Sequence, residues 1–152
     1  MFESLRRLLS EAARRQTALP ANEEELRLAS AALLFHVIAV DGIVTEDERG
    51  ALQAVLEERF GLDDDAADEL MSAAEDADDN AVDLYSFTHV LKAALEPQDR
   101  ERIIEMMWKL VYADGAVHEF EDNAVWRVAE LLGVSAEDRI RLKQTVRDHA
   151  RN

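Results

Sequence analysis

The chain has 152 residues, with 33 acidic and 17 basic side chains and a formal net charge of −16. This length favours a single domain, and an apolar fraction of 48% is sufficient for a buried core. The absence of cysteine excludes disulfide frameworks, iron–sulfur clusters and thiol nucleophiles, and the acidic charge makes nucleic acid and anionic membranes poor partners.

The chain shows no targeting or membrane-spanning segment. Its N-terminus carries an early acid, Glu3, and no sustained apolar run, which argues against a signal peptide. The longest apolar stretch, residues 29–40, contains Ser30 and His36 and is shorter than the roughly 20 residues that a transmembrane helix needs. We therefore expect a soluble, cytoplasmic protein.

Residues 1–20 predict a basic amphipathic helix. Its apolar stripe consists of Phe2, Leu5, Leu8, Leu9, Ala12 and Ala13. Its other faces carry Arg6, Arg7, Arg14 and Arg15. Such a helix either docks on its own domain or uses its arginines to bind a partner, with a membrane surface as a less favoured target. Residues 21–152 are expected to form the helical domain itself.

Capping signals place the first helices of that domain. Asn22 and Thr45 begin sequences of capping-box form, which predict one helix through Ile38 and a second from Thr45 onwards. Gly61 ends the second helix directly after Phe60. The next helix lies in residues 61–83, which carry ten acidic side chains and no basic one, and this stretch is expected to be solvated.

Four further helices complete the domain. The first of them is short, extending from an Asp83 cap to Leu95, and Pro97 then suits the first turn of a helix that continues to about Asp114. The last two cover about residues 119–132 and 135–149. Apolar residues recur at helical spacing throughout, so we predict an all-α fold, a compact bundle of about seven to eight helices.

An internal repeat divides the domain into two halves, about residues 25–75 and 98–148. A shift of 73 residues aligns Asp41-Gly42 with Asp114-Gly115, and it also aligns Glu46 with Glu119 and Glu48 with Glu121. Each half therefore reads helix, Asp-Gly turn, helix, Gly stop, helix, with the shared pattern D-G-x-V-x-E-x-E. This regularity predicts two pseudo-symmetric structural units around one core.

Helical spacing separates these acidic residues into two groups. The first group, Asp41, Asp114, Glu48 and Glu121, continues the apolar stripes of its helices and is expected on the core side. The second group, Glu46 and Glu119, is expected on the solvated face, peripheral to any site. Carboxylates held together in low dielectric raise their pKa values or recruit a cation, so the first group is a candidate site for a divalent ion.

The pattern around each Asp-Gly turn equals the back half of an EF-hand loop. The front half is missing, so a competent site needs both turns together, with His118 as a candidate additional ligand. Ca²⁺ is the first candidate, and Mg²⁺, Mn²⁺ and Zn²⁺ remain open. Residues 76–80 begin like an EF-hand as well, but Ala81 replaces its turn glycine, so we discount that stretch.

Helix capping offers an equally weighted explanation of the same acidic residues. Thr45 with Glu48 forms a capping box on its own, in which Glu48 accepts a bond from a free backbone N–H. Gly42 and Gly115 are then ordinary C-terminal glycines of helices. Under this interpretation no metal is bound.

The two Asp-Gly segments, residues 39–44 and 113–117, each have a Glu seven residues after the Asp, and they resemble the tellurite-resistance TerB-like domain family. The similarity covers about residues 25–148. It implies an all-helical domain of two pseudo-symmetric halves with an acidic cluster proposed to bind metal, which falls on Asp41, Glu48, Asp114 and Glu121 here. It also implies a role in tellurite or stress response. Val40 departs from the family pattern, which usually has Ala before Asp-Gly.

These observations lead to a hypothesis of a non-enzymatic metal-binding module. The alternative is a protein-interaction scaffold that works through its basic first helix and its acidic 61–83 region. An enzyme is disfavoured because the sequence shows no phosphate loop, metalloprotease motif or nucleophile elbow. We expect His36 on the solvent side, and Trp108, Trp126, Phe35 and Met106 in the core.

Overall fold

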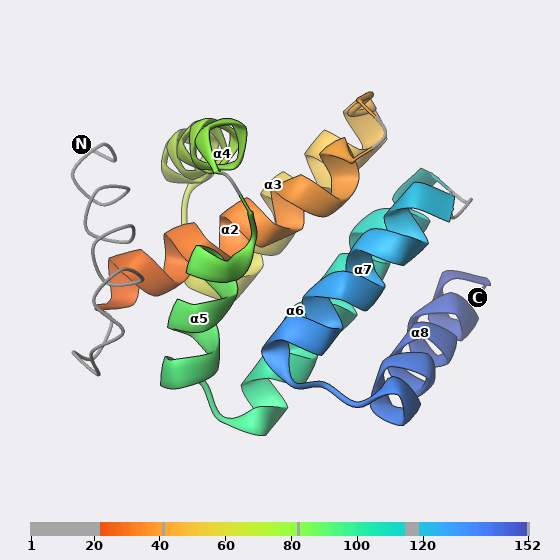
Figure 1. Ribbon diagram of the computed structural model, residues 1–152. Coiled ribbons are helices and arrows are strands. Elements are labelled where there is room, and N and C mark those ends of the chain that lie inside the picture. The colour runs from red at the N-terminus through yellow and green to blue at the C-terminus, as the bar shows by residue number, and fades with distance from the viewer. Residues whose placement is uncertain (1–21, 41, 82, 115–118, 152) are drawn as a thin grey trace.

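The computed structural model describes residues 22–40, 42–81, 83–114 and 119–151 (Figure 1). Seven α-helices and one 3₁₀-helix make up these ranges, and no strand occurs in them. In chain order they are α2 (Glu23–Ala39), α3 (Glu46–Phe60), α4 (Asp64–Asn80), α5 (Tyr85–Ala94), α6 (Pro97–Val111), η1 (Tyr112–Asp114), α7 (Glu119–Leu132) and α8 (Ala136–Arg151). The prediction of an all-α fold is confirmed.

Side-chain caps set the starts of the helices where the sequence places them. Asn22 Oδ1 accepts a hydrogen bond from the Glu25 N–H at 2.8 Å, and Asp63 Oδ1 accepts one from the Ala66 N–H at the same distance. Ser135 Oγ accepts from the Asp138 N–H at 3.1 Å. Each bond satisfies one of the free N–H groups of a first helical turn. These helix starts therefore depend on hydrogen bonds between residues three positions apart rather than on tertiary contacts.

Glycines with positive φ end the second helix of each half. Gly61, after α3, has φ 63°, and Gly133, after α7, has φ 77°. This left-handed conformation strains any residue with a Cβ, and it lets the chain leave a helix sharply. The two positions correspond in the internal repeat, so both halves use the same device to reverse direction into their third helix.

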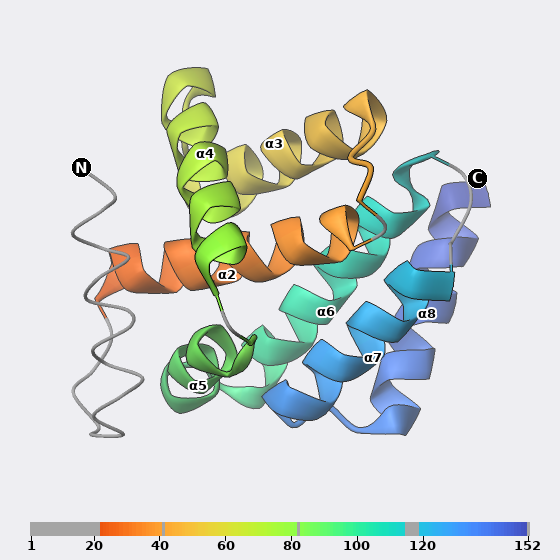
Figure 2. The same cartoon turned by 45° about the horizontal axis from the view of Figure 1, so that its top comes forward.

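Helix α2 is the centre of the molecule. Every residue from Leu28 to Ile38 is buried except His36, which is half-buried. Five helices surround it, because α2 contacts α3, α4, α5, α6 and α7. In Figure 2, α2 runs through the middle of the molecule with α4 crossing it. An apolar surface on all sides is what such a position requires.

The two halves have matched internal packing and also pack across each other. Within each half the first helix packs on the third, α2 on α4 and α6 on α8. Between the halves α2 contacts α6 and α7, and α3 contacts α6 and η1. The contacts between the halves therefore involve the helices that flank both Asp-Gly segments.

The prediction that Trp126 lies in the core is wrong. Trp108, Phe35 and Met106 are buried as expected, but Trp126 on α7 is 41% exposed. The guanidinium of Arg139 lies over the Trp126 ring and is itself buried. Burial lowers the pKa of Arg139 from its ordinary value, whereas the carboxylates of Asp122 and Glu130 act in the opposite direction.

The described helices include none that is both long enough and apolar enough to span a bilayer. Even the apolar α2 has only 17 residues. A membrane-crossing helix needs about 20 predominantly apolar residues.

Candidate functional site

Glu48 is a buried carboxylate that caps its own helix. It is the third residue of α3 and only 2% exposed. Its Oε1 accepts hydrogen bonds from the Thr45 N–H at 3.0 Å and from the Thr45 hydroxyl at 3.1 Å. In return, Thr45 Oγ1 accepts from the Glu48 N–H at 3.1 Å. The capping box predicted at Thr45 is therefore formed, and its bonds use Oε1 of Glu48 rather than Oε2.

Glu121 occupies the matching place in the second half. It is the third residue of α7, as Glu48 is of α3, and it has no exposed surface. The expectation that both glutamates face the core is confirmed. Two carboxylates buried at equivalent positions are unusual, because a charged group loses its hydration on burial and needs compensation.

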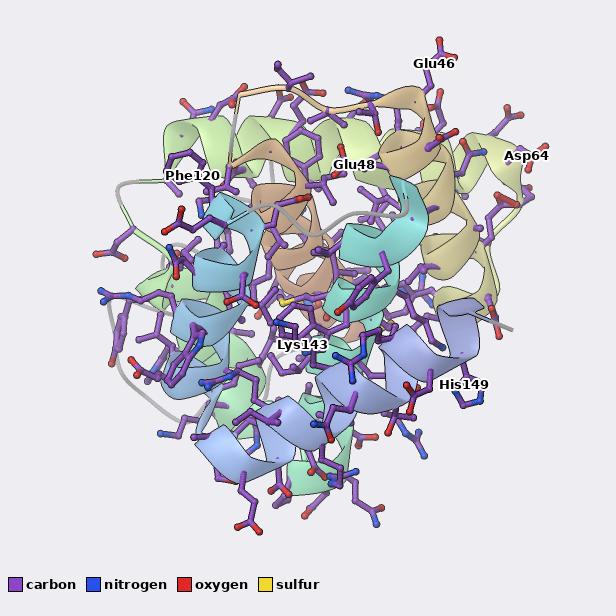
Figure 3. The ribbon with its side chains drawn as sticks, turned by 90° about the vertical axis from the view of Figure 1, so that its right-hand side faces the viewer. Glu46, Glu48, Asp64, Phe120, Lys143 and His149 are labelled. Carbon is purple, nitrogen blue, oxygen red and sulfur yellow. The ribbon has the colours of Figure 1, made fainter. Side chains whose placement is uncertain are left out.

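The outer glutamates behave as the sequence predicts. Glu46 and Glu119 are exposed in the first turns of α3 and α7. In Figure 3, Glu46 projects outward from the start of α3, whereas Glu48 lies on the inner side. Glu46 and Glu48 thus face opposite environments although they are only two residues apart, as helical geometry requires.

Several predicted site residues fall outside the described part of the chain. They are Asp41, His118 and the four arginines Arg6, Arg7, Arg14 and Arg15. Asp114 is the last residue of η1, and its backbone is described but its side chain is not. Their predicted roles as ligands or partner contacts stay predictions.

The packing of the halves brings together the helices that flank the two Asp-Gly segments. Helix α3, which carries Glu48, contacts η1, which ends at Asp114. Helix α2, which ends just before the first Asp-Gly turn, contacts α7, which carries Glu121. Figures 1 and 2 both show the start of α3 and the start of α7 near the end of α6. Each half therefore directs its glutamate-bearing helix toward the other half.

Within the described residues no three acidic or histidine side chains are gathered closely enough to hold a metal ion. The described side chains include Glu48 and Glu121, but not Asp41, Asp114 and His118. The donor set that these positions offer consists almost entirely of carboxylate oxygens. Such a set fits a hard cation rather than a soft one.

The discounted EF-hand-like stretch is helical. Residues 76–80 form the last turn of α4, where the Asn80 side-chain amide donates to the Asp76 carbonyl at 2.7 Å. A calcium loop requires irregular backbone that wraps around the ion, so these residues do not form one.

The structure also shows a contact that the sequence does not reveal. His36 on α2 is half-buried, and its Nδ1 lies 2.8 Å from Asp78 Oδ1 on α4. The expectation of a solvent-side histidine therefore needs correction. The acidic 61–83 stretch is likewise not wholly solvated, since Asp78 ties α4 to the central helix. The 73-residue shift of the repeat aligns His36 with Lys109, and this alignment carries no signal of the pairing.

The chain was compared with known proteins. The family model described as "Tellurite resistance protein TerB" matches residues 27–144, which is most of the chain and includes all of α3 to α7. Comparison with curated proteins and with solved structures gives no match.

Proposed function

The chain belongs to the TerB family of tellurite resistance proteins, and from this membership we propose that it is a non-enzymatic helical module whose two Asp-Gly turns bind one divalent cation. The observation that carries the proposal is the burial of Glu48 and Glu121 at matching positions, directly after the two turns. The proposed ligands are Asp41, Glu48, Asp114 and Glu121, with His118, Glu46 and Glu119 peripheral. The proposed setting is a tellurite or stress response.

Electrostatics supports a shared site. Buried carboxylates that approach each other repel strongly, because the low dielectric of the interior weakens screening. The contact between α3 and η1 and the contact between α2 and α7 support this site, because each joins an element of one half to an element of the other half. A cation between the two turns would offset the repulsion and bridge the halves. Capping accounts for one oxygen of Glu48 and does not conflict with a metal on the other.

The chemistry of the ligands favours Ca²⁺. All four proposed ligands are carboxylates, and Ca²⁺ accepts irregular sets of oxygen ligands, whereas Mg²⁺ demands near-ideal octahedral geometry. Mn²⁺ and Zn²⁺ remain candidates, although Zn²⁺ prefers nitrogen and sulfur ligands, and the sequence from either Asp-Gly to its second Glu offers only His118 of that kind. Direct capture of tellurite by this site is disfavoured, since an acidic cluster repels an oxyanion.

Calorimetric titration of the metal-free protein with Ca²⁺, Mg²⁺, Mn²⁺ and Zn²⁺ tests the proposal. We expect one cation per chain with a Kd below about 1 mM, the weak limit of protein calcium sites. Glu121→Gln should weaken binding at least tenfold, whereas its exposed neighbour Glu119→Gln, with the same loss of charge, should leave binding nearly unchanged. Glu48→Gln and Glu46→Gln form the same comparison in the first half.

A second readout separates binding from folding. A ligand that binds only the folded state raises Tm, by an amount that grows roughly with the logarithm of the ligand concentration above Kd. Ca²⁺ should therefore raise the Tm of the wild type and of Glu119→Gln, but not that of Glu121→Gln. Absence of binding below about 1 mM for all four cations, or equal weakening by both variants, would refute the shared site.

The scaffold function is the second candidate, and the formed capping box at Thr45 favours it. Under this alternative the motif acids are structural, and partners bind the basic segment 1–20 or the acidic face of α4. Affinity capture with full-length protein and with a variant lacking residues 1–20 tests it. Identical partners for both proteins would count against a role for the segment.

A further inference from the structure

A cavity of about 320 Å³ lies between α3 and α6, and none of the acidic motif residues lines it. We call it the α3–α6 cavity. Its apolar lining comes from Val55 and Met106. Its polar lining consists of the cations Arg59, Arg102 and Lys109 and the anions Glu58 and Glu105.

The lining carries a net positive charge on a protein whose net charge is −16. Within the described residues Arg59 makes no ion pair, and its guanidinium lies 5.9 Å from the centre of the Phe60 ring. Arg102 and Lys109 have carboxylate neighbours, Asp99 at 3.6 Å and Glu105 at 3.7 Å, but each pair lies on one helix and its cation is exposed while its carboxylate is half-buried. Such surface pairs contribute little and exchange readily.

We propose that the α3–α6 cavity binds a small organic anion, a carboxylate or a phosphate ester with an apolar portion. Arg59 and Arg102 would bind its oxygens through planar guanidinium groups, whose paired N–H donors match carboxylate and phosphate geometry. Lys109 adds a point charge, and Val55 with Met106 contacts the apolar portion. The volume falls at the small end of ligand sites, which span about 300–1,000 Å³.

A neighbouring cavity provides an internal comparison. It has a volume of about 430 Å³ and lies between α6, η1 and α8, where Lys109 and Glu105 also line it. Its other lining residues include Tyr112, Thr145 and His149, which carry no charge when the histidine is neutral. The charges of Lys109 and Glu105 then cancel. Only the α3–α6 cavity, of these two, therefore combines a positive surplus with two guanidinium groups.

This inference is independent of the proposed cation site. None of the residues that line the α3–α6 cavity belongs to the set Asp41, Glu48, Asp114 and Glu121. Failure of anion binding would leave the metal proposal intact, and failure of metal binding would leave this one intact.

NMR titration of the ¹⁵N-labelled full-length chain with inorganic phosphate and, separately, with succinate tests the inference. We expect saturable shifts centred on α3 and α6, with a Kd below about 10 mM for at least one probe, as a small ligand with a few charge-assisted hydrogen bonds should reach. The stronger of the two probes identifies the head group. Shifts centred on α8 and His149 would overturn the assignment to this cavity.

Three variants make the test specific. Arg59→Gln should weaken binding roughly tenfold, because it removes a charged donor. Glu58→Gln should tighten binding about threefold, because it removes a repulsive carboxylate that has no ion-pair partner within the described chain. Arg127→Gln is the matched control, an exposed arginine on α7 that lies outside both cavities, and it should change affinity less than twofold.

Two results would overturn the inference. One is the absence of saturation with both probes up to about 10 mM, which corresponds to negligible affinity. The other is equal weakening by Arg59→Gln and Arg127→Gln, which would show diffuse attraction to any arginine instead of a built site. Because both side chains are exposed, their variants are expected to fold normally.

Discussion

At the scale of single residues, Glu48 is a helix-capping carboxylate that is also buried. Glu48 satisfies the backbone N–H of Thr45 while its side chain is withdrawn from water. A glutamate that only capped a helix could remain at the surface, as capping-box residues commonly do. The degree of burial, rather than the cap itself, is what distinguishes Glu48 from the exposed Glu46.

Thr45→Ala isolates the energy of this cap. The variant loses the hydroxyl that accepts from the Glu48 N–H, so we expect the free energy of unfolding in urea to fall by about 1 kcal/mol. Thr145→Ala is the control, because Thr145 is exposed on α8 and its hydroxyl bonds only the Arg141 carbonyl of its own helix. That variant should be neutral or slightly stabilising. An equal loss in both variants would contradict a specific capping contribution.

Glu25 gives a pH-dependent prediction. Burial raises the pKa of this carboxyl above its usual 4.5. The folded state therefore binds the proton more tightly than the unfolded state, and the resulting stability is present below pH 4.5 and is lost as pH rises through the folded-state pKa. Glu25→Gln removes this term, so the variant should gain stability relative to the wild type as pH rises from 4 to 7.

Urea unfolding at several pH values between 4 and 7 measures this difference. The exposed neighbour Glu24→Gln is the control, because it removes a carboxyl from the same helical turn without removing a buried group. A pH-independent difference between Glu25→Gln and the wild type would contradict the raised pKa of Glu25.

At the scale of elements, helix ends are fixed locally and helix contacts are not. The caps at Asn22, Asp63 and Ser135 and the glycine at residue 61 are short-range signals, which is why the sequence predicts these boundaries closely. The exposure of Trp126 was also predictable, since it lies off the stripe formed by Val125, Val128 and Leu132. The prediction of a core position for Trp126 rests on its size and aromatic character alone, which is why it fails.

The contact between His36 and Asp78 could not be predicted in the same way. The two residues are 42 positions apart, and only the crossing of α2 and α4 brings them together. The candidate site is likewise predictable in its local features but not in its long-range contacts. Helical periodicity predicts that Glu48 and Glu121 face inward, but which helix of the other half each one meets depends on long-range packing.

Three glycine variants test the role of the helix stops. Gly61→Ala should cost about 1 kcal/mol, because alanine must adopt positive φ although nothing obstructs its Cβ. Gly133→Ala should cost roughly 1 kcal/mol more, since its Cβ would lie 3.2 Å from Arg100 Nη1, which donates to the Leu132 carbonyl. Gly50→Ala, inside α3 and unobstructed, should instead stabilise by about 0.5–1 kcal/mol.

Chemical denaturation of the three variants under identical conditions provides the measurement. The order of stability, with Gly50→Ala highest and Gly133→Ala lowest, is the result to compare. Equal costs at Gly61 and Gly133 would show that Arg100 adjusts freely and that its bond to the end of α7 contributes nothing.

At the scale of the whole molecule, the charge of −16 is distributed unevenly. Acidic side chains dominate α4, whereas cations gather beside α6 and α8, where Arg141 pairs with Glu101 at 2.8 Å and Lys143 with Asp122 at 2.7 Å. Repulsion among the surplus acidic side chains destabilises the folded state. Salt screens this repulsion, with a screening length of about 10 Å at 0.1 M ionic strength.

We therefore expect sodium chloride to stabilise the protein. Raising it from about 10 mM to 200 mM should increase the free energy of unfolding, because screening relieves more repulsion than it removes from the exposed ion pairs. The measurement needs EDTA throughout, so that trace divalent cations do not contribute. A fall in stability would show that the ion pairs around α8 outweigh the net charge.

The packing between the two halves bears on whether either half could be stable alone. A half isolated at the loop before α5 would leave one side of α2 and α3 uncovered, because α6, η1 and α7 cover that side in the intact chain. An isolated half would have to bury this surface elsewhere, and a second copy could cover it in a symmetric pair with equivalent contacts on both sides. The arrangement thus has the form of a homodimer joined into one polypeptide, in which each half covers a surface that the other would leave exposed.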